Sequence, residues 1–424
     1  MLGGLAPFFL RQNVVPIEAP ANPSTGVSML TQGLGRAQLF NGMVGFLYSC
    51  TGPLAIILAV GTQGGLSAAE LASWVFGAFF VNGWLTLWAC WRYRQPLAFY
   101  WTIPGAVLIG PALQHLSFAE IIGAYFVTGA LMLVLGLSGY VKRVMAWLPM
   151  PIVMAMVAGV FLKFGLDVVR GLHADWLLAG SMTLTFLVLS ANKAWGERLP
   201  PIIGALLVGI GVLLLAADYQ PTFGDSAWAQ PVWTMPVWSW RAMVELVIPL
   251  SITVLVVQNG MGIGILRAAK HEPPVNAITS ACGVWSILSA CVGSVSTCLT
   301  GPVNAVLTNG VAKETQWTGG IVVGLLAIGF GAAAPLFTQA LLATPAAFIT
   351  TLGGLAMIRV LQGAFVAAFS HRFTLGALVT FLVTVADLPI WNISAAFWGL
   401  VFGAATSWWL ERADFKTLNQ PTNL

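Results

Sequence analysis

The sequence predicts an all-α polytopic membrane protein, with 14 transmembrane segments arranged as an inverted repeat of seven plus seven. Three observations lead to this fold. The chain of 424 residues is 58% hydrophobic and 8% charged, with a mean hydropathy of +0.87, whereas soluble domains carry roughly 25% charged residues. Its apolar runs reach about 20 residues, the length that crosses a bilayer as a helix. These runs do not alternate apolar with polar residues, as the strands of a membrane β-barrel do.

The apolar runs, taken in chain order, give the expected spans. Two of them, the third and the tenth, are short and carry Pro next to Gly, so each is expected to be a half-helix. We expect a cytoplasmic tail at 1–37 and another at 411–424. The spans are expected at residues 38–60, 67–91, 99–114, 118–137, 148–168, 176–191, 200–217, 242–266, 274–292, 298–311, 317–334, 345–369, 374–389 and 391–410.

The distribution of Lys and Arg agrees with these spans. With both termini in the cytoplasm, all but four of the 18 Lys and Arg residues fall in cytoplasmic segments. Arg170 and Arg241 fall in external connections, and Lys163 and Arg359 fall within spans. Membrane proteins show this excess of positive charge on the cytoplasmic side. Omitting either short span would invert every later connection, so we expect both to count as crossings.

The long external connection at 218–241 divides the spans into two repeats, 38–217 and 242–410. This connection contains three Pro and four Trp residues. Because seven is odd, the second repeat would enter the membrane with the opposite orientation to the first. Inverted repeats of this kind are a common architecture of secondary transporters.

The third and tenth spans contain similar motifs, TIPGAVL from Thr102 and TGPVNAVL from Thr300. Pro fits the first turn of a helix better than its interior, so each half-helix is expected to start at the Pro. Helix starts offer unpaired N–H groups and a partial positive charge. Broken backbone at mid-membrane is tolerated where it lines a cavity, and two such starts suit an anion. The alternative is a pair of kinks that only shape packing. The candidate binding residues here are Tyr100, Trp101, Thr102, Pro104, Gly105, Thr300, Gly301, Pro302 and Asn304.

Polar residues also interrupt the first and eighth spans. The first contributes the hydroxyl groups of Tyr48, Ser49 and Thr51. The eighth carries two adjacent amides, which need hydrogen-bond partners when buried, followed by glycines that allow a close approach. We expect these residues to line the same site, and the alternative is helix–helix packing through small and polar residues. The residues of the eighth span are Gln258, Asn259 and Gly262.

Few ionisable groups fall inside the spans. Glu245, at the external end of the eighth span, is the candidate for proton coupling, because an intramembrane ionisable group is a functional candidate by default. Asp167 and Asp387 are weaker candidates for the same role. All four His residues fall in or near connections, so a buried His relay is not expected.

Signatures of enzymes, metal sites and cofactor sites are missing from the sequence. The motifs HExxH, GxSxG and GxxxxGK[ST] do not occur. The five Cys residues lie in apolar segments, with spacings typical of neither a zinc site nor a disulfide framework. The net charge of +4 is small. We therefore expect no enzyme activity, no cofactor, no metal and no nucleic-acid partner.

Three segments resemble signature segments of the benzoate/proton symporter family (BenE-type). They are YRQPLAFYWTIPGAVL (Tyr93–Leu108), AGVFLKFGL (Ala158–Leu166) and VVQNGMGIGIL (Val256–Leu266). The resemblance extends over nearly all of residues 38–410. This family is more distantly similar to the uracil and xanthine permeases and to the sulfate and bicarbonate transporters.

The resemblance implies a fold and a function. Spans 1–4 and 8–11 would form a core domain and spans 5–7 and 12–14 a gate domain, with substrate between the third and tenth half-helices. The chain would import benzoate or a related aromatic carboxylate together with protons, by alternating access. It would act as a homodimer in the bacterial inner membrane. The uracil permeases carry acidic residues in the eighth and tenth spans, whereas this chain has Gln258 near the first place and Gly301-Pro302 in the tenth span.

The absence of these acidic residues argues against a nucleobase as the substrate. It also leaves the proton-carrying residue unidentified. Two alternatives stay open: a nucleobase/proton symporter, and an anion channel or transporter of the sulfate-transporter type. Coupling to sodium in place of protons also stays open.

Overall fold

The computed structural model describes residues 17–20, 27–141, 149–216, 226–388, 390–391, 393 and 395–418. Seven helical stretches in this part of the chain are long and apolar enough to cross a membrane. They are α2–α3 (Arg36–Cys50, Gly52–Gln63), α4–η1–α5 (Ala68–Phe76, Gly77–Val81, Asn82–Tyr93), α7 (Phe118–Ser138), α9 (Met150–Ala174), α13–α15 (Trp240–Ala268), η4–α18 (Lys313–Thr315, Gln316–Ala332) and α20 (Ala346–Ala368).

Shorter helices occupy the remaining expected spans. Six are apolar and 10–17 residues long, and the tenth span holds the 7-residue helix α17 (Gly301–Leu307). The six are α6 (Ile103–Ala112), α10 (Trp176–Ala191), α12 (Pro201–Leu215), α16 (Val275–Ala290), α21 (Thr374–Ala386) and α22 (Ala395–Leu410).

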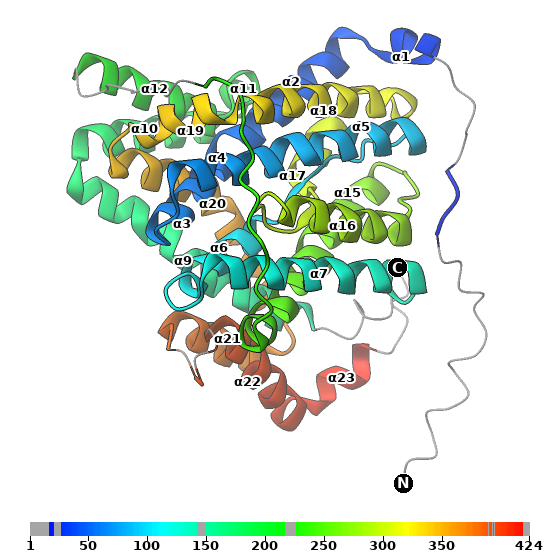
Figure 1. The fold of residues 1–424 in the computed structure, drawn as a ribbon, viewed down its shortest axis with the longest axis vertical. Coiled ribbons are helices and arrows are strands. Elements are labelled where there is room, and N and C mark those ends of the chain that lie inside the picture. Colours follow the sequence, from blue (N-terminus) through cyan, green and yellow to red (C-terminus); the bar gives the residue numbers. More distant parts are fainter. Residues whose placement is uncertain are drawn as a thin grey trace.

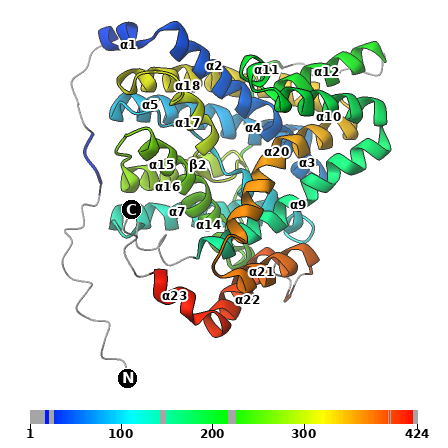
Figure 2. The same cartoon turned by 180° about the vertical axis from the view of Figure 1, so that it is seen from behind.

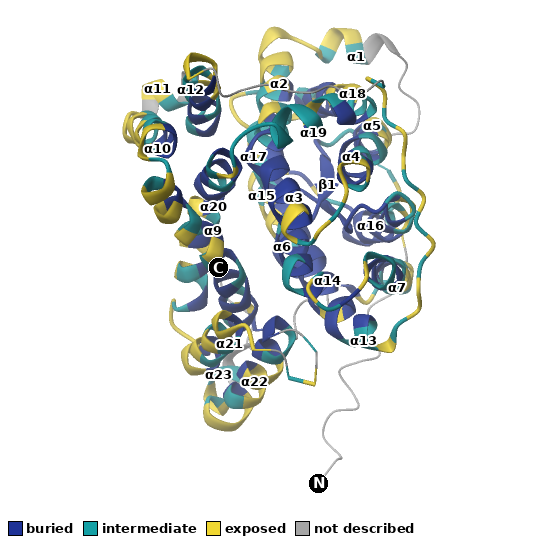
Figure 3. Cartoon of the chain, turned by 60° about the vertical axis from the view of Figure 1, so that its left-hand side comes forward, coloured by how far each residue is buried: buried dark blue, intermediate teal, exposed yellow. Residues whose placement is uncertain are grey.

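The helices pack in two groups (Figures 1 and 2). In the first group, formed by α2–α7 and α13–α18, α7 lies along α16, α5 lies along α18, and α17 packs against α2 and α15. In the second group, formed by α9–α12 and α20–α22, α9 packs against both α20 and α21. Helix α3 meets α20 where the groups touch, and the centre of the first group is almost wholly buried (Figure 3).

The first expected span is broken, which the sequence analysis did not anticipate. Helix α2 ends at Cys50 and α3 begins at Gly52, with Thr51 between them outside helical geometry. Pro53 causes the break, since it has no N–H to donate and its ring crowds the carbonyl of the preceding turn. The Thr51 hydroxyl donates to the carbonyl oxygens of Leu47 and Tyr48 and so satisfies the end of α2.

Three π-helical turns widen the second and eighth spans. One is η1, and the eighth span contains η2 (Met243–Val247) and η3 (Thr253–Asn259), separated by α14 (Ile248–Ile252) and followed by α15 (Gly260–Ala268). Turns of this kind occur often at functional sites. Neither their presence nor their positions were expected from the sequence.

The segments outside the spans are more ordered than expected in their described parts. Within 1–37, α1 (Val27–Gly33) is helical, α2 already begins at Arg36, and the Glu18 carboxylate accepts from the N–H groups of Asn276 and Ala277 at the start of α16. Residues 1–16 and 21–26 of that tail lie outside the described residues, as do 217–225 and 419–424. The C-terminal tail contains α23 (Arg412–Leu418), and helix α19 (Ala334–Leu342) follows α18 directly.

The described end of the 218–241 connection is extended and crosses the first group of helices (Figure 1). The N–H of Ala229 donates to Ala332 at 2.7 Å, and the N–H of Val237 donates to Ala119 at 2.9 Å. The N–H of Val232 donates to the Ser73 hydroxyl at 2.9 Å. The connection therefore joins the ends of α18, α4 and α7.

A two-stranded antiparallel sheet lies inside the first group. Strand β1 (Phe99–Trp101) pairs with β2 (Thr297–Leu299), with Phe99 opposite Leu299, Tyr100 opposite Cys298 and Trp101 opposite Thr297. Every residue of both strands is buried. Each strand leads directly into a short helix, β1 into α6 and β2 into α17.

Candidate functional site

The two half-helices start beside one another, as their motifs predict. The residues before Pro104 and Pro302 are extended, and the helices begin at Ile103 and Gly301, each with Pro in the first turn. Two backbone hydrogen bonds continue the sheet to the helix starts: Thr102 N–H donates to Ser296 at 2.9 Å and Thr300 N–H donates to Ala98 at 3.0 Å. Both helix N-termini therefore lie at one buried point of the first group.

Side chains from other helices satisfy the backbone of the two strands. The Thr86 hydroxyl accepts from Phe99 N–H, and the Asn304 amide oxygen accepts from Ala98 N–H at 2.9 Å. On the other strand, the Asn259 amide oxygen accepts from Leu299 N–H at 2.7 Å, and the Ser286 hydroxyl accepts from Thr297 N–H at 2.9 Å. The oxygens of Asn304 and Asn259 are thus used to hold the broken backbone in place.

A small central cavity lies between the helix starts and the first span. Its volume is about 10 Å³, which is the room of about one water molecule. Five of the residues predicted to form the site line this cavity, together with Pro53 and Ile103. The five are Tyr48, Ser49, Tyr100, Trp101 and Thr300.

Two residues that line this cavity each carry a buried polar atom without a hydrogen-bond partner. These atoms are the hydroxyl oxygen of Tyr100 and the Nε1 of Trp101. The Ser49 hydroxyl, which belongs to the same lining, donates to the Gly45 carbonyl at 3.2 Å. Buried polar groups are nearly always paired, so two unpaired donors at one cavity indicate a place for an acceptor.

The other residues predicted for the site surround this cavity without lining it. Thr102 donates to the Thr253 hydroxyl at 3.1 Å and accepts from Gly105 N–H. A Cβ added at Gly262 would lie 2.8 Å from Leu299, so this glycine allows α15 to approach β2. Thr51 lines a separate apolar groove of about 310 Å³ between α3, α12 and α19. The remaining residues of the set are Pro104, Gln258, Gly301 and Pro302, all buried except the half-buried Pro302.

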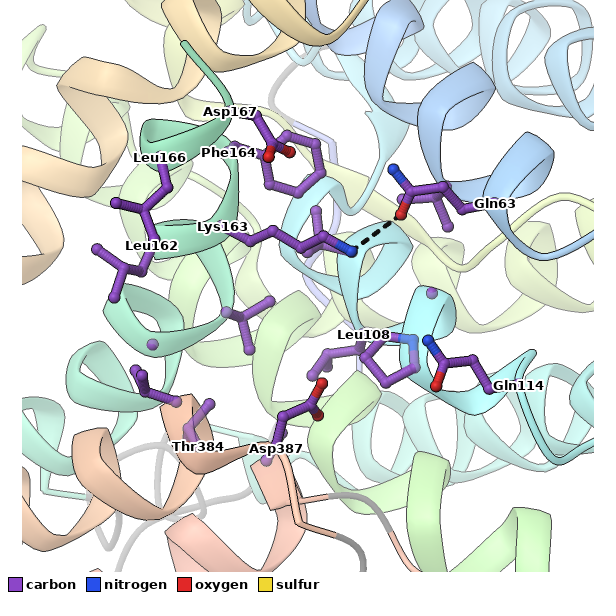
Figure 4. Close-up of a pocket in the computed structure, with 18 of the residues that line it drawn as sticks. Gln63, Leu108, Gln114, Leu162, Lys163, Phe164, Leu166, Asp167, Thr384 and Asp387 are labelled. Carbon is purple, nitrogen blue, oxygen red and sulfur yellow. Dashed lines mark hydrogen bonds between the residues drawn. The ribbon is translucent and has the colours of Figure 1, made fainter. Parts of the chain in front are cut away.

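A larger cavity, of about 320 Å³, opens between the two groups of helices (Figure 4). Lys163 of α9 reaches across it and donates from Nζ to the Gln63 amide oxygen of α3 at 3.0 Å. Asp167, paired with Arg170 at 2.8 Å, also lines the cavity, as does Asp387. The sequence analysis noted Lys163 inside a span but did not connect it with Gln63, because nothing in the sequence indicates which residues face each other across the groups.

The carboxylate of Glu245 is buried and lies within hydrogen-bond distance of a His side chain. Its Oε2 lies 2.9 Å from His115 Nε2, and the exposed fraction of the side chain is 0% for Glu245 and 25% for His115. Glu245 belongs to η2, whereas His115 belongs to the connection between α6 and α7. The sequence analysis missed His115, since its place in a connection argued against a role in the membrane.

Comparison with known proteins gives the family. The family model described as benzoate membrane transport protein matches residues 33–408. Inner membrane protein YdcO of Escherichia coli is 29% identical over 369 residues, which cover 86% of this chain and 93% of that protein. The benzoate membrane transport protein of Acinetobacter baylyi is 24% identical over 389 residues, covering 90% of this chain and 96% of that protein.

Solved structures share the fold. The transmembrane domain of the cyanobacterial bicarbonate transporter BicA superposes with a TM-score of 0.59 at 15% identity, covering 87% of this chain and 97% of that one. The murine anion transporter Slc26a9, in its inward-facing state, gives 0.58 at 15% identity, covering 92% and 71%. The chain is therefore a multi-pass inner membrane transporter and not an enzyme, and it belongs to the benzoate membrane transport protein family.

Proposed function

We propose that this protein imports benzoate or a related aromatic carboxylate together with protons, by alternating access between a core and a gate. The first group of helices corresponds to the proposed core (spans 1–4 and 8–11) and the second to the proposed gate (spans 5–7 and 12–14). In this proposal the chain crosses the membrane 14 times as two inverted repeats, with both termini in the cytoplasm. Helix in every expected span and the antiparallel pairing of β1 with β2 support that arrangement. We further propose a homodimer.

The observation that carries the substrate assignment is the set of donors at the central cavity. A carboxylate only accepts hydrogen bonds, and the cavity offers it the unpaired donors of Tyr100 and Trp101 beside two helix N-termini. Helix N-termini favour anions through their free N–H groups and their dipole. The rings of Tyr48 and Tyr100 give the cavity an aromatic wall suited to an aromatic substrate.

The central cavity must enlarge before a substrate binds, because it has room for only about one water molecule. We infer that the structure is a closed conformation and that the gate moves against the core to open it. The cavity at Lys163 and Gln63 lies between these two bodies at the ends of α3 and α6, which the positive-inside rule places outside. It is the proposed external entrance.

Proton coupling follows from the charge of the substrate. Moving one negative charge into a cell against a negative-inside potential costs about 2.3 kcal/mol per 100 mV. One proton carried in the same direction cancels this charge. A sodium ion would cancel this charge equally. An experiment that compares uptake under a proton gradient and under a sodium gradient therefore identifies the coupling ion.

The test is uptake of labelled benzoate by the purified protein in proteoliposomes, with an inward proton gradient, an inward sodium gradient, or neither. The proposal expects accumulation with the proton gradient alone and its loss on adding a protonophore. Unlabelled competitors then test the substrate class. Competition by uracil or xanthine but not by benzoate would contradict the proposal in favour of a nucleobase carrier.

Currents far above the turnover of a carrier would contradict it in favour of an anion channel. The fold shared with anion transporters is the observation that keeps this second candidate in the test. Bicarbonate and sulfate therefore belong among the competitors.

A further inference from the structure

One carboxylate stands apart from all other acidic side chains whose burial is described. Glu245 is the only one of them that is buried, and its side chain has no exposed surface. A buried carboxylate is costly unless a partner balances its charge. The His115 imidazole offers this carboxylate a hydrogen bond, with its Nε2 at 2.9 Å from Oε2.

The titratable groups on the elements packed against η2 are few. Helix α7 brings Glu120, whose carboxylate accepts from the N–H and hydroxyl of Ser117, and Tyr125, whose hydroxyl is buried without a hydrogen-bond partner. Helix α13 (Trp240–Ala242) brings Arg241, and α14 brings no titratable side chain. The His115 imidazole, from the connection between α6 and α7, lies within hydrogen-bond distance of the Glu245 carboxylate, at 2.9 Å.

The pair opens to water at one end only. His115 is 25% exposed, and its neighbour Gln114 lines the 320 Å³ cavity between the two groups of helices (Figure 4). A proton from the external side thus reaches the partly exposed imidazole before it reaches the buried carboxylate.

The helical stretch α13–α15 connects Glu245 to the start of the half-helix α6. Thr253 follows Glu245 by eight residues, or about 12 Å along the helix axis. The Thr253 hydroxyl bonds the Thr102 hydroxyl at 3.1 Å, at the start of α6. Only α14 separates the π-turn η2, which contains Glu245, from the π-turn η3, which begins at Thr253.

We propose that His115 and Glu245 together carry the cotransported proton, an inference that rests on the proposed function. With a neutral imidazole and an ionised carboxylate, the pair has one negative charge. A proton taken up from outside makes the pair neutral, and the substrate carboxylate then supplies the single negative charge of the loaded core. The empty core returns with the negative charge of the pair. Each cycle moves one proton and one carboxylate inward and no net charge.

The test uses the full-length protein in proteoliposomes and two measurements on each variant. One is benzoate uptake driven by an inward proton gradient, and the other is counterflow of labelled against internal benzoate at equal pH. Glu245→Gln is expected to lower the ratio of driven uptake to counterflow by about tenfold or more, because the amide cannot take up the proton. His115→Gln is expected to lower the same ratio and to shift the pH at which driven uptake is half-maximal.

Glu120→Gln is the matched control, because Gln can replace Glu in a capping box. The ratio of driven uptake to counterflow in this variant is expected to stay within about twofold of the wild type.

A wild-type ratio in Glu245→Gln would overturn the inference. The pair would then have only a structural role, holding η2 to the α6–α7 connection. If Glu245→Gln does not fold, as judged by gel filtration, an unchanged ratio and pH profile in His115→Gln overturns it instead. No benzoate transport by the wild type would contradict the proposed function, a result distinct from both.

The charge balance has a separate readout. A potassium diffusion potential imposed with valinomycin is expected to leave the initial rate of driven uptake within about twofold. A rate that rises steeply with the potential would overturn the one-proton assignment.

Discussion

The two half-helices have matching backbones but unequal side-chain chemistry. Thr102 caps α6, accepting from Gly105 N–H at 3.2 Å, and its hydroxyl also bonds Thr253. Thr300 occupies the same place before α17, makes no capping bond and lines the central cavity. The comparison teaches that the shared motif sets the backbone geometry of both half-helices, while the Thr102 side chain caps its helix and Thr300 lines the cavity of the proposed site.

Thr300→Val tests the ligand-facing side and has the largest expected effect. The substitution keeps the shape of the side chain and removes the hydroxyl at the cavity. A hydrogen bond to a charged group contributes about 1.5–3 kcal/mol, so the Kd for benzoate is expected to rise about 10- to 100-fold. Isothermal titration of the purified protein measures it, and an unchanged Kd would remove the distinction between the two threonines.

Trp101→Phe sharpens the comparison on the strand that precedes α6. It removes the unpaired Nε1–H and keeps an aromatic ring near Phe79, whose ring centroid lies 5.0 Å away. We expect the Kd to rise about tenfold. Trp74→Phe is the matched control, because its Nε1 is also buried and unpaired but does not line the cavity. Equal effects of the two changes would contradict the assignment of Trp101.

Thr102→Val tests the structural side. Losing an N-terminal capping side chain costs about 0.5–2 kcal/mol of stability, so the free energy of unfolding is expected to fall by about 1 kcal/mol. The change in Kd is expected to be smaller than for Thr300→Val. Urea titration in detergent micelles followed by circular dichroism measures the stability, and a larger change in Kd than for Thr300→Val would reverse the roles given to the two residues.

The smallest expected effect concerns the far end of α17. Gln316 Nε2 donates to the carbonyls of Thr308 and Val311 just after that helix, so its amide oxygen is left to accept from His271 Nε2 at 2.7 Å. Burial lowers the pKa of His271, which lies between the eighth and ninth spans. The unfolded chain therefore binds more protons below neutral pH, and stability is lost as the pH falls through the range where His271 takes up its proton.

Melting curves between pH 7 and pH 5 measure this loss. His271→Gln is expected to show a shallower decline than the wild type. The exposed His173 serves as the control, and His173→Gln is expected to follow the wild-type curve. A decline as steep in His271→Gln as in the wild type would contradict the role of this bond in holding the second half-helix.

The positions of the half-helices could be predicted because Pro, which has no N–H to donate, fits the first turn of a helix better than its interior. The same rule could have located the break before Pro53, which the sequence analysis passed over. The pairing of β1 with β2 could not be predicted, since strands of three residues carry no periodicity. The contact between His115 and Glu245 could not be predicted either, because 130 residues separate them and only the packed fold brings them together.

In the first group, early helices pack against helices that come much later in the chain, and this has a consequence for synthesis of the protein. Helices α5 and α7 pack along α18 and α16, and the N–H of Ala98 is satisfied by Asn304, which is translated some 206 residues later. Until that residue is made, the buried N–H of Ala98, just before β1, lacks the acceptor that the folded protein gives it. The packing and hydrogen bonding of the first group of helices are thus completed only after the chain that follows the long connection has been made.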